Sequence, residues 1–189
     1  AASDVYKRQV LVHHSREQAL VEALIAEIRA RYTSAPLTNE EWPHIINRKH
    51  FDRLVGLLGS GAISHGGQID PETLRISPTI LTDVAWDSPV MQEEIFGPII
   101  PIQPFKTLDE AIEKANNTIY GLSSYFFGHN AKEISKAFEG MEAGEIFING
   151  SGGTEQTPHA GVKQSGVGCD KSPWSLEEYF DFKYCAMIP

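Results

Sequence analysis

The chain has 189 residues, 41% of them hydrophobic and 22% charged, which is the composition of a globular protein rather than a disordered or fibrous one. Its 16 lysines and arginines against 25 aspartates and glutamates give a net charge of −9. This acidic balance disfavours nucleic acid and anionic membranes as partners. The longest uncharged stretch, residues 115–131, is too polar to span a bilayer.

The first half of the chain shows two helical periodicities and several short apolar runs typical of strands. Ser15 followed by Gln18 forms a capping-box pattern at the start of the first helix. Asn47 is a suitable N-cap for the second helix, which Gly59 ends. The expected elements are a strand at 10–14, a helix at 15–31, a helix at 47–59, strands at 62–65 and 79–84, and a turn at 93–98.

The second half has a regular β-α-β-α-β order, with strands at 99–105, 120–128 and 145–149 and helices at 108–116 and 131–139. This order implies parallel strands joined by right-handed crossovers. We therefore predict an α/β fold of three layers, a mostly parallel sheet with helices on both faces. Pro101 and Pro104 lack ladder donors, which predicts that the strand containing them lies at an edge of the sheet.

The last 40 residues are expected to contain a glycine-rich loop at 150–168, a short helix at 175–179 and an alternating strand at 181–188. A terminal strand with one apolar face needs a partner, from this chain or another subunit.

Histidine and cysteine spacing gives no sign of a metal centre. None of the seven histidines shows the i, i+4 spacing of a second ligand, so no metal site is predicted. The two cysteines, Cys169 and Cys185, are far apart and form no C-x-x-C pair, which favours reduced thiols and a cytoplasmic location. No basic-then-apolar leader opens the chain, so we do not expect secretion.

The most informative segment is residues 92–98, QEEIFGP. In an extended chain Glu94 and Phe96 lie on the same side. A carboxylate can accept two hydrogen bonds from a vicinal diol, and an aromatic ring can pack against a flat ring. The pair therefore suits a ribose and its nicotinamide. The alternative interpretation is a solvated acidic turn beside a core phenylalanine.

Three segments together resemble the aldehyde dehydrogenase superfamily. Residues 92–98 resemble its signature turn, and residues 158–168, PHAGVKQSGVG, resemble its Pro-Phe-Gly-Gly-x-Lys-x-Ser-Gly-x-Gly loop. Between them, residues 143–149, AGEIFIN, resemble a family strand that ends in Asn. Their order and separations also fit, from about residue 10 to the C-terminus. Residues 45–58 and 77–81 are most similar to the class 3-type branch.

The resemblance implies oxidation of an aldehyde to a carboxylate with NAD or NADP, through a cysteine thioester. It implies that Glu94 binds the nicotinamide ribose, that Phe96 holds the nicotinamide, and that Asn149 ends a catalytic-domain strand by the substrate. Residues 1–9 are then a non-family segment, 10–175 a partial catalytic domain, and 176–189 a strand that joins a neighbouring subunit in a homo-oligomer.

The chain departs from the family at its start. The family's nucleophilic cysteine would fall near Asp4, where there is none, and Cys169 and Cys185 lie in other motifs. The general-base Glu, the nucleotide-binding loop and the oxyanion Asn would all lie upstream. We therefore expect a C-terminal piece of an aldehyde dehydrogenase, inactive alone. The alternatives are a non-catalytic truncated subunit that pairs with full-length subunits, and an unrelated βαβ nucleotide-binding domain.

His159 stands where most of the family has the Phe of its loop, a ring that lines the substrate funnel. The His-Ala-Gly sequence is similar to that of lactaldehyde dehydrogenases, which act on small hydroxylated aldehydes. An imidazole can bond to a substrate hydroxyl, and it discriminates against an apolar analogue that leaves it unpaired. Two observations oppose this: His159 could instead bond to its own loop, and the class 3-type branch is associated with larger apolar and aromatic aldehydes.

Overall fold

The computed structural model describes residues 9–150, 157–166, 168–171, 173 and 175. The chain divides into two compact units, one formed by Lys7–Ala111 and the other containing the described residues from Ile112 onward. No helix in the described ranges is long and apolar enough to cross a membrane.

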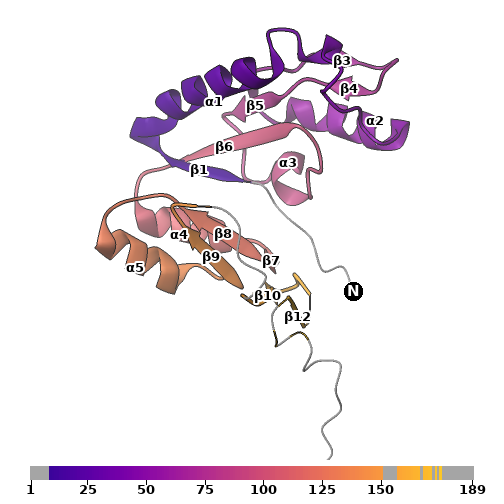
Figure 1. The fold of residues 1–189 in the computed structure, drawn as a ribbon. Coiled ribbons are helices and arrows are strands. Elements are labelled where there is room, and N and C mark those ends of the chain that lie inside the picture. Colours follow the sequence, from indigo (N-terminus) through magenta and orange to yellow (C-terminus); the bar gives the residue numbers. More distant parts are fainter. Residues whose placement is uncertain (1–8, 151–156, 167, 172, 174, 176–189) are drawn as a thin grey trace, which may run out of the picture. The chain divides into compact units, whose positions relative to one another are not determined.

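The first unit is built on a four-stranded sheet (Figure 1). Its order is β1 (Val10–His13), β6 (Ile99–Phe105), β5 (Thr79–Thr82) and β2 (Ala62–His65). The pairs β1–β6 and β6–β5 are parallel, and β2 runs antiparallel to β5. The predicted strands at 10–14, 62–65, 79–84 and 99–105 are therefore all present, with small differences at their ends.

Helices cover both faces of this sheet. Ile80 and Ile102 are fully buried against Val21 of α1 (Glu17–Tyr32). Leu81 and Ile99 belong instead to a cluster with α2 (Arg48–Leu57) and α3 (Pro89–Gln92), whose buried members are Phe51, Leu54, Leu57, Ile76, Leu81, Val84, Val90, Met91, Ile95 and Ile99. Successive strand residues point to opposite faces, so the alternation separates two cores. This confirms the mixed α/β class, and the first unit has three layers.

The prediction that residues 99–105 form an edge strand is wrong. Strand β6 lies between β1 and β5, but it meets them with different halves. Its first three residues are in register with β5, where Pro101 lies opposite Leu81, and its last four with β1, where Pro104 lies opposite Val12. Each half thus has one partner in register, and a proline's missing N–H can fall on the side without one.

Helix starts follow local hydrogen bonding. Asn47 caps α2 as predicted, since its Oδ1 accepts from His50 N at 2.9 Å. The capping box at Ser15 is wrong, because a 3-10 turn, η1 (His14–Arg16), precedes α1 and the Gln18 amide donates to Glu22 instead. The remaining elements of this unit are η2 (Pro36–Thr38), η3 (Leu58–Ser60), and the strands β3 (Ile69–Asp70) and β4 (Arg75–Ile76).

The second unit contains a two-stranded parallel sheet of β8 (Ser123–Phe126) and β9 (Glu145–Ile148), joined by α5 (Ala131–Gly140). Asn130 caps α5, since its Oδ1 accepts from Lys132 N at 3.0 Å and from Glu133 N at 3.4 Å. The helix α4 (Leu108–Asn116) precedes this sheet along the chain. The expected single parallel core is not what the pairing shows, because β6 pairs with β1 and β5 while β8 pairs with β9.

Two further predictions for this unit are corrected. The strand expected at 120–128 divides at Leu122 into β7 (Tyr120–Gly121) and β8. The expected glycine-rich loop contains β10 (His159–Ala160) and β11 (Val162–Lys163), which pair with β12 (Cys169–Asp170) and β7. The predicted helix at 175–179 falls almost wholly, and the strand at 181–188 wholly, outside the described residues.

Candidate functional site

The turn at residues 93–98 is held by one side chain from α2. Arg53 Nη1 donates to Glu93 Oε2 at 3.0 Å and to the Glu94 carbonyl at 3.2 Å, and Nη2 donates to the Ile95 carbonyl at 2.7 Å. The Arg53 side chain is only 27% exposed, so these charge-assisted bonds are partly shielded from water. The planar guanidinium group of Arg53 therefore donates to three acceptors of the turn and fixes its backbone.

Within this turn, Phe96 projects outward. It is 79% exposed, whereas the preceding Ile95 is 3% exposed and belongs to the core. The backbone of Phe96 is left-handed, with φ of 46°, so the extended geometry used to place Glu94 and Phe96 on one side is wrong. The alternative of a core phenylalanine is also wrong. The fixed turn therefore presents an exposed aromatic ring close in sequence to the half-buried Glu94.

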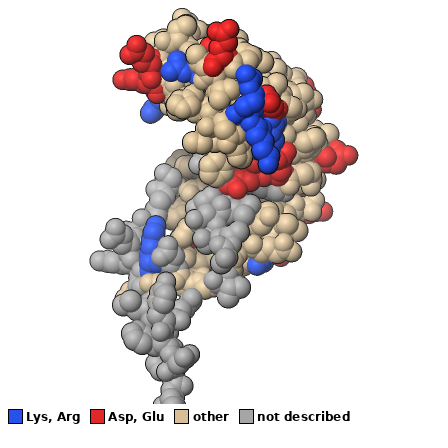
Figure 2. Space-filling view, turned by 90° about the vertical axis from the view of Figure 1, so that its right-hand side faces the viewer, with Lys and Arg blue, Asp and Glu red and all other residues tan. Residues whose placement is uncertain are grey.

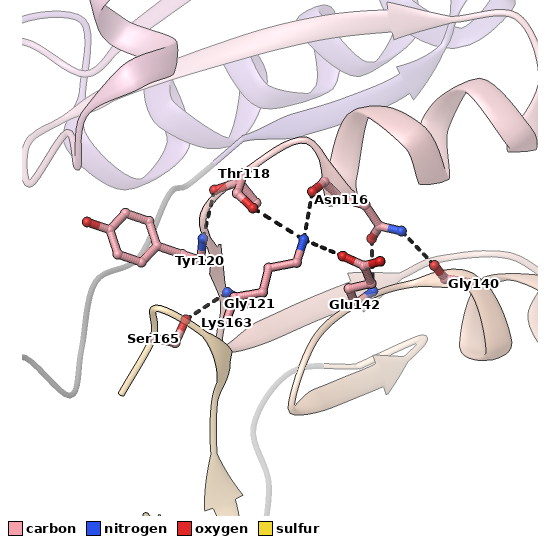
Figure 3. Close-up of polar contacts among 8 residues, drawn as sticks. All are labelled: Asn116, Thr118, Tyr120, Gly121, Gly140, Glu142, Lys163 and Ser165. Atoms are coloured by element: carbon pink, nitrogen blue, oxygen red, sulfur yellow. Dashed lines mark hydrogen bonds and ion pairs between the residues drawn. The ribbon is translucent and has the colours of Figure 1, made fainter. Parts of the chain in front are cut away.

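The loop with His159 is anchored by its own lysine (Figure 3). Lys163 Nζ donates to the carbonyls of Asn116 at 2.7 Å and Thr118 at 3.2 Å, and it forms an ion pair with Glu142. The Asn116 amide extends the cluster, since Nδ2 donates to the Gly140 carbonyl and Oδ1 accepts from Glu142 N. A single ammonium thus connects the ends of α4 and α5 to the loop.

Two close approaches complete the anchoring. Ser165, 1% exposed, accepts a hydrogen bond from Gly121 N at 2.7 Å (Figure 3). Gly144, just before β9, lies so close to β10 that a Cβ there would overlap the carbonyl oxygen of Ala160. The loop therefore packs against β7 and β9 through backbone contacts that larger residues would prevent.

His159 contacts a carboxylate from β9. Its Nδ1 lies 2.9 Å from Glu145 Oε2, and the two side chains are only 17% and 12% exposed. The hydroxyl of Ser123 donates to the same oxygen at 2.8 Å. The side-chain partner that the structure describes for His159 thus comes from a strand and not from its own loop.

Asn149 directly follows β9, as predicted. Its Oδ1 accepts from Gly128 N at 2.8 Å, and its Nδ2 donates to the Gly128 carbonyl at 2.7 Å. With φ of 53°, the residue turns the chain out of the strand. The amide acts here as a clamp on the end of β8.

Of the four residues predicted to form the site, Glu94 and Phe96 share the first unit, and Asn149 and His159 share the second. Arg53, Glu145 and Lys163 were not among the predicted site residues, although Lys163 lies in the motif at residues 158–168. None of the four lines the cavity of about 350 Å³ between the end of α1 and β2, whose lining includes Arg29, His65 and Ser77.

The charged side chains and the potential metal ligands of the described residues indicate no additional site. On the face drawn in Figure 2, basic and acidic side chains lie beside one another. Among the described residues, no group of three or more His, Cys, Asp or Glu could hold a metal ion.

Comparison with known proteins decides the family. The sequence profile of the Aldehyde dehydrogenase family matches residues 5–185. The chain belongs to the aldehyde dehydrogenase family. Mouse aldehyde dehydrogenase family 3 member B2 is 37% identical in an alignment that covers 94% of this chain and 38% of the relative. The bovine dimeric NADP-preferring aldehyde dehydrogenase is 34% identical over 95% of this chain and 77% of its own length.

Solved structures of aldehyde dehydrogenases share the fold. The substrate-bound state of Staphylococcus aureus AldH matches with a TM-score of 0.85 and 31% identity, over 100% of this chain and 43% of that one. Lactaldehyde dehydrogenase from Escherichia coli matches with a TM-score of 0.81 and 28% identity, over 91% and 37%. The chain thus spans about two fifths of these structures and of the mouse relative.

Proposed function

We propose that this chain is the C-terminal part of an NAD(P)-dependent aldehyde dehydrogenase that oxidises an aldehyde to a carboxylate through a cysteine thioester. The observation that carries the proposal is the pair of anchored loops, one with an exposed ring and a carboxylate and the other with a partly buried histidine. Family membership supports aldehyde oxidation. The nucleophile comes from upstream, because no cysteine stands near Asp4.

The turn at 93–98 is the proposed contact for the coenzyme. The bound nicotinamide coenzyme, NAD or NADP, accepts the hydride. Phe96 offers an exposed apolar face to its flat ring, and the Glu94 carboxylate is the acceptor for two ribose hydroxyls. Arg53 fixes the backbone between them, so little ordering is needed when the ligand binds.

The substrate side is proposed to lie in the second unit. His159 offers a polar surface that favours a small hydroxylated aldehyde. Asn149 is proposed to lie near the substrate at the end of β9, and its clamp on Gly128 keeps that strand end in place. We further propose a cytoplasmic homo-oligomer joined through residues 176–189.

A coenzyme assay tests the proposal. The purified 189-residue chain should yield no NADH or NADPH with any aldehyde, because losing a covalent nucleophile costs several orders of magnitude in rate. The enzyme extended upstream to include the family's cysteine should be active. In that enzyme Glu94→Gln should weaken coenzyme binding by about 1.5–3 kcal/mol, one charge-assisted hydrogen bond, while Glu72→Gln on an exposed loop serves as the control.

Two outcomes would contradict it. Turnover by the chain alone that survives alkylation of Cys169 and Cys185 would show that it carries another nucleophile. An extended enzyme with no activity would favour the alternative, a non-catalytic subunit that pairs with full-length copies, which co-purification with such copies would reveal.

A further inference from the structure

Glu145 joins two side chains of the second unit and has no role in the proposed chemistry. Its Oε2 receives the hydroxyl of Ser123 at 2.8 Å and lies 2.9 Å from His159 Nδ1. The Glu145 side chain is only 12% exposed. A carboxylate in such surroundings is stabilised by donors, and both of its neighbours can donate.

The chemistry of these groups sets the proton on His159. An ionised carboxylate only accepts hydrogen bonds, so the short contact requires a proton on Nδ1. A neutral imidazole carries one proton, and its other nitrogen then holds a lone pair. Nε2 of His159 is therefore a hydrogen-bond acceptor whenever the ring is neutral.

The fold holds the three side chains in place. Ser123 and Glu145 are directly paired in the parallel register of β8 and β9. Gly144 allows the backbone of Ala160 to lie against the start of β9, which brings His159 to the carboxylate. A contact built on two strands and a backbone approach is more rigid than one made by loop residues alone.

We propose that Glu145 is a positioning residue that holds His159 in the Nδ1–H tautomer, so that Nε2 accepts a hydrogen bond from a substrate hydroxyl. The proposal rests on the proposed function and narrows its substrate class to aldehydes with a hydroxyl donor near the carbonyl. An unsubstituted aldehyde leaves Nε2 without a partner and is disfavoured.

The first test needs only the 189-residue chain. Nitrogen-15 NMR of the neutral His159 ring distinguishes the two tautomers. Wild type should show Nδ1–H. Glu145→Ala should shift His159 toward Nε2–H, and Glu145→Gln should give a mixture, because an amide can donate as well as accept.

A matched control and a second variant keep this test decisive. Glu139 on α5 also accepts from a serine, Ser135 at 3.0 Å, so Glu139→Gln should leave His159 unchanged. Ser123→Ala removes the competing donor but keeps the carboxylate, and it should retain Nδ1–H even if the Glu145 variants do not fold. An Nε2–H ring in wild type or in Ser123→Ala overturns the proposal.

The second test uses the enzyme extended upstream. The ratio of kcat/KM for a 2-hydroxyaldehyde to that for an unsubstituted aldehyde of equal length should fall about tenfold in Glu145→Ala, the worth of one hydrogen bond. Ser123→Ala should keep the wild-type ratio. If the extended enzyme is active but Glu145→Ala leaves the ratio unchanged, the inference on Glu145 fails and the proposed function stands. If the extended enzyme oxidises no aldehyde, the proposed function fails, whatever the tautomer.

Discussion

The two motif loops are each fixed by one basic side chain, but the anchors come from different places. Arg53 holds the turn at 93–98 from α2, 40 residues before Glu93. Lys163 belongs to the loop that it holds and reaches outward to Asn116 and Thr118. The turn at 93–98 is thus anchored by a residue of another element, whereas the loop at 158–168 is anchored by a residue of its own.

The two loops also differ in how closely a glycine packs against its neighbours. A Cβ at Gly97 would lie 2.5 Å from a methyl of Leu54, a side chain that can shift. A Cβ at Gly144 would overlap backbone, the carbonyl oxygen of Ala160, which cannot move without displacing β10. The second loop therefore has less tolerance for change at its contact with the strands.

Alanine substitutions at Gly97 and Gly144 should give the largest difference in stability between the two loops. We expect Gly144→Ala to cost about 3 kcal/mol of unfolding free energy and Gly97→Ala about 1 kcal/mol, the two ends of the range for overpacking. Gly56→Ala, in α2 with nothing within 4 Å of the added carbon, should stabilise by about 0.5–1 kcal/mol. Urea denaturation measures all three, and equal costs at Gly97 and Gly144 would remove the distinction.

Replacing Arg53 or Lys163 tests whether each side chain anchors its own loop. Arg53→Met and Lys163→Met should each cost about 1–3 kcal/mol, because carbonyl acceptors lose a charged donor. Amide hydrogen exchange should quicken around residues 93–98 in the first variant and around Gly121 in the second.

Surface variants of the same type supply the controls for the anchors. Arg31→Met breaks an exposed pair with Glu27, and Lys132→Met changes an exposed residue of α5. Both should cost less than about 1 kcal/mol. If Arg53→Met and Lys163→Met are no worse than these, neither side chain anchors its loop.

Asn149→Asp should have a smaller effect, confined to the second unit. The change removes the Nδ2 donor to Gly128 and keeps a residue that tolerates the left-handed backbone. We expect a loss of about 1 kcal/mol and faster exchange of the Gly128 amide. Asn117→Asp, at an exposed position, should change neither, and a silent Asn149→Asp would show that the clamp has no energetic role.

The smallest expected effect is a pH dependence of the first unit. Burial, helped by the charge of Arg29, lowers the pKa of His65 from its ordinary 6.5. The unfolded chain then binds this proton more readily, so the stability from neutral His65 is complete above pH 6.5 and declines as pH falls toward the folded-state pKa. His65→Gln should flatten this decline in urea midpoints, and His44→Gln, at an exposed site, should not.

A short-range signal predicted the start of α2 correctly, because the N-cap bond of Asn47 spans only three residues. The capping box expected at Ser15 was wrong, because the Gln18 amide donates to Glu22. The edge assignment for β6 failed, because pairing depends on β1 and β5, strands distant in sequence. The prolines show which backbone N–H donors β6 lacks. Only the strand register shows whether a neighbouring strand has an acceptor at that position.

The candidate site shows the same limit. The motifs identified His159 and Phe96, but the partner of His159 is Glu145, placed by the pairing of β8 with β9. Arg53 carried no signal, since an arginine on an amphipathic helix is ordinarily a surface residue. Lys163 could have been found, because it stands in the loop that it anchors.

The divided pairing of β6 has a mechanical consequence. Since β1 meets only residues 102–105 and β5 only residues 99–101, the two ladders are loaded in series through the covalent chain of β6. The β5 side has one further backbone bond, from Thr79 N to the Pro98 carbonyl. A force drawing β1 away from β5 must therefore break one ladder while the backbone of β6 stays joined to the other strand.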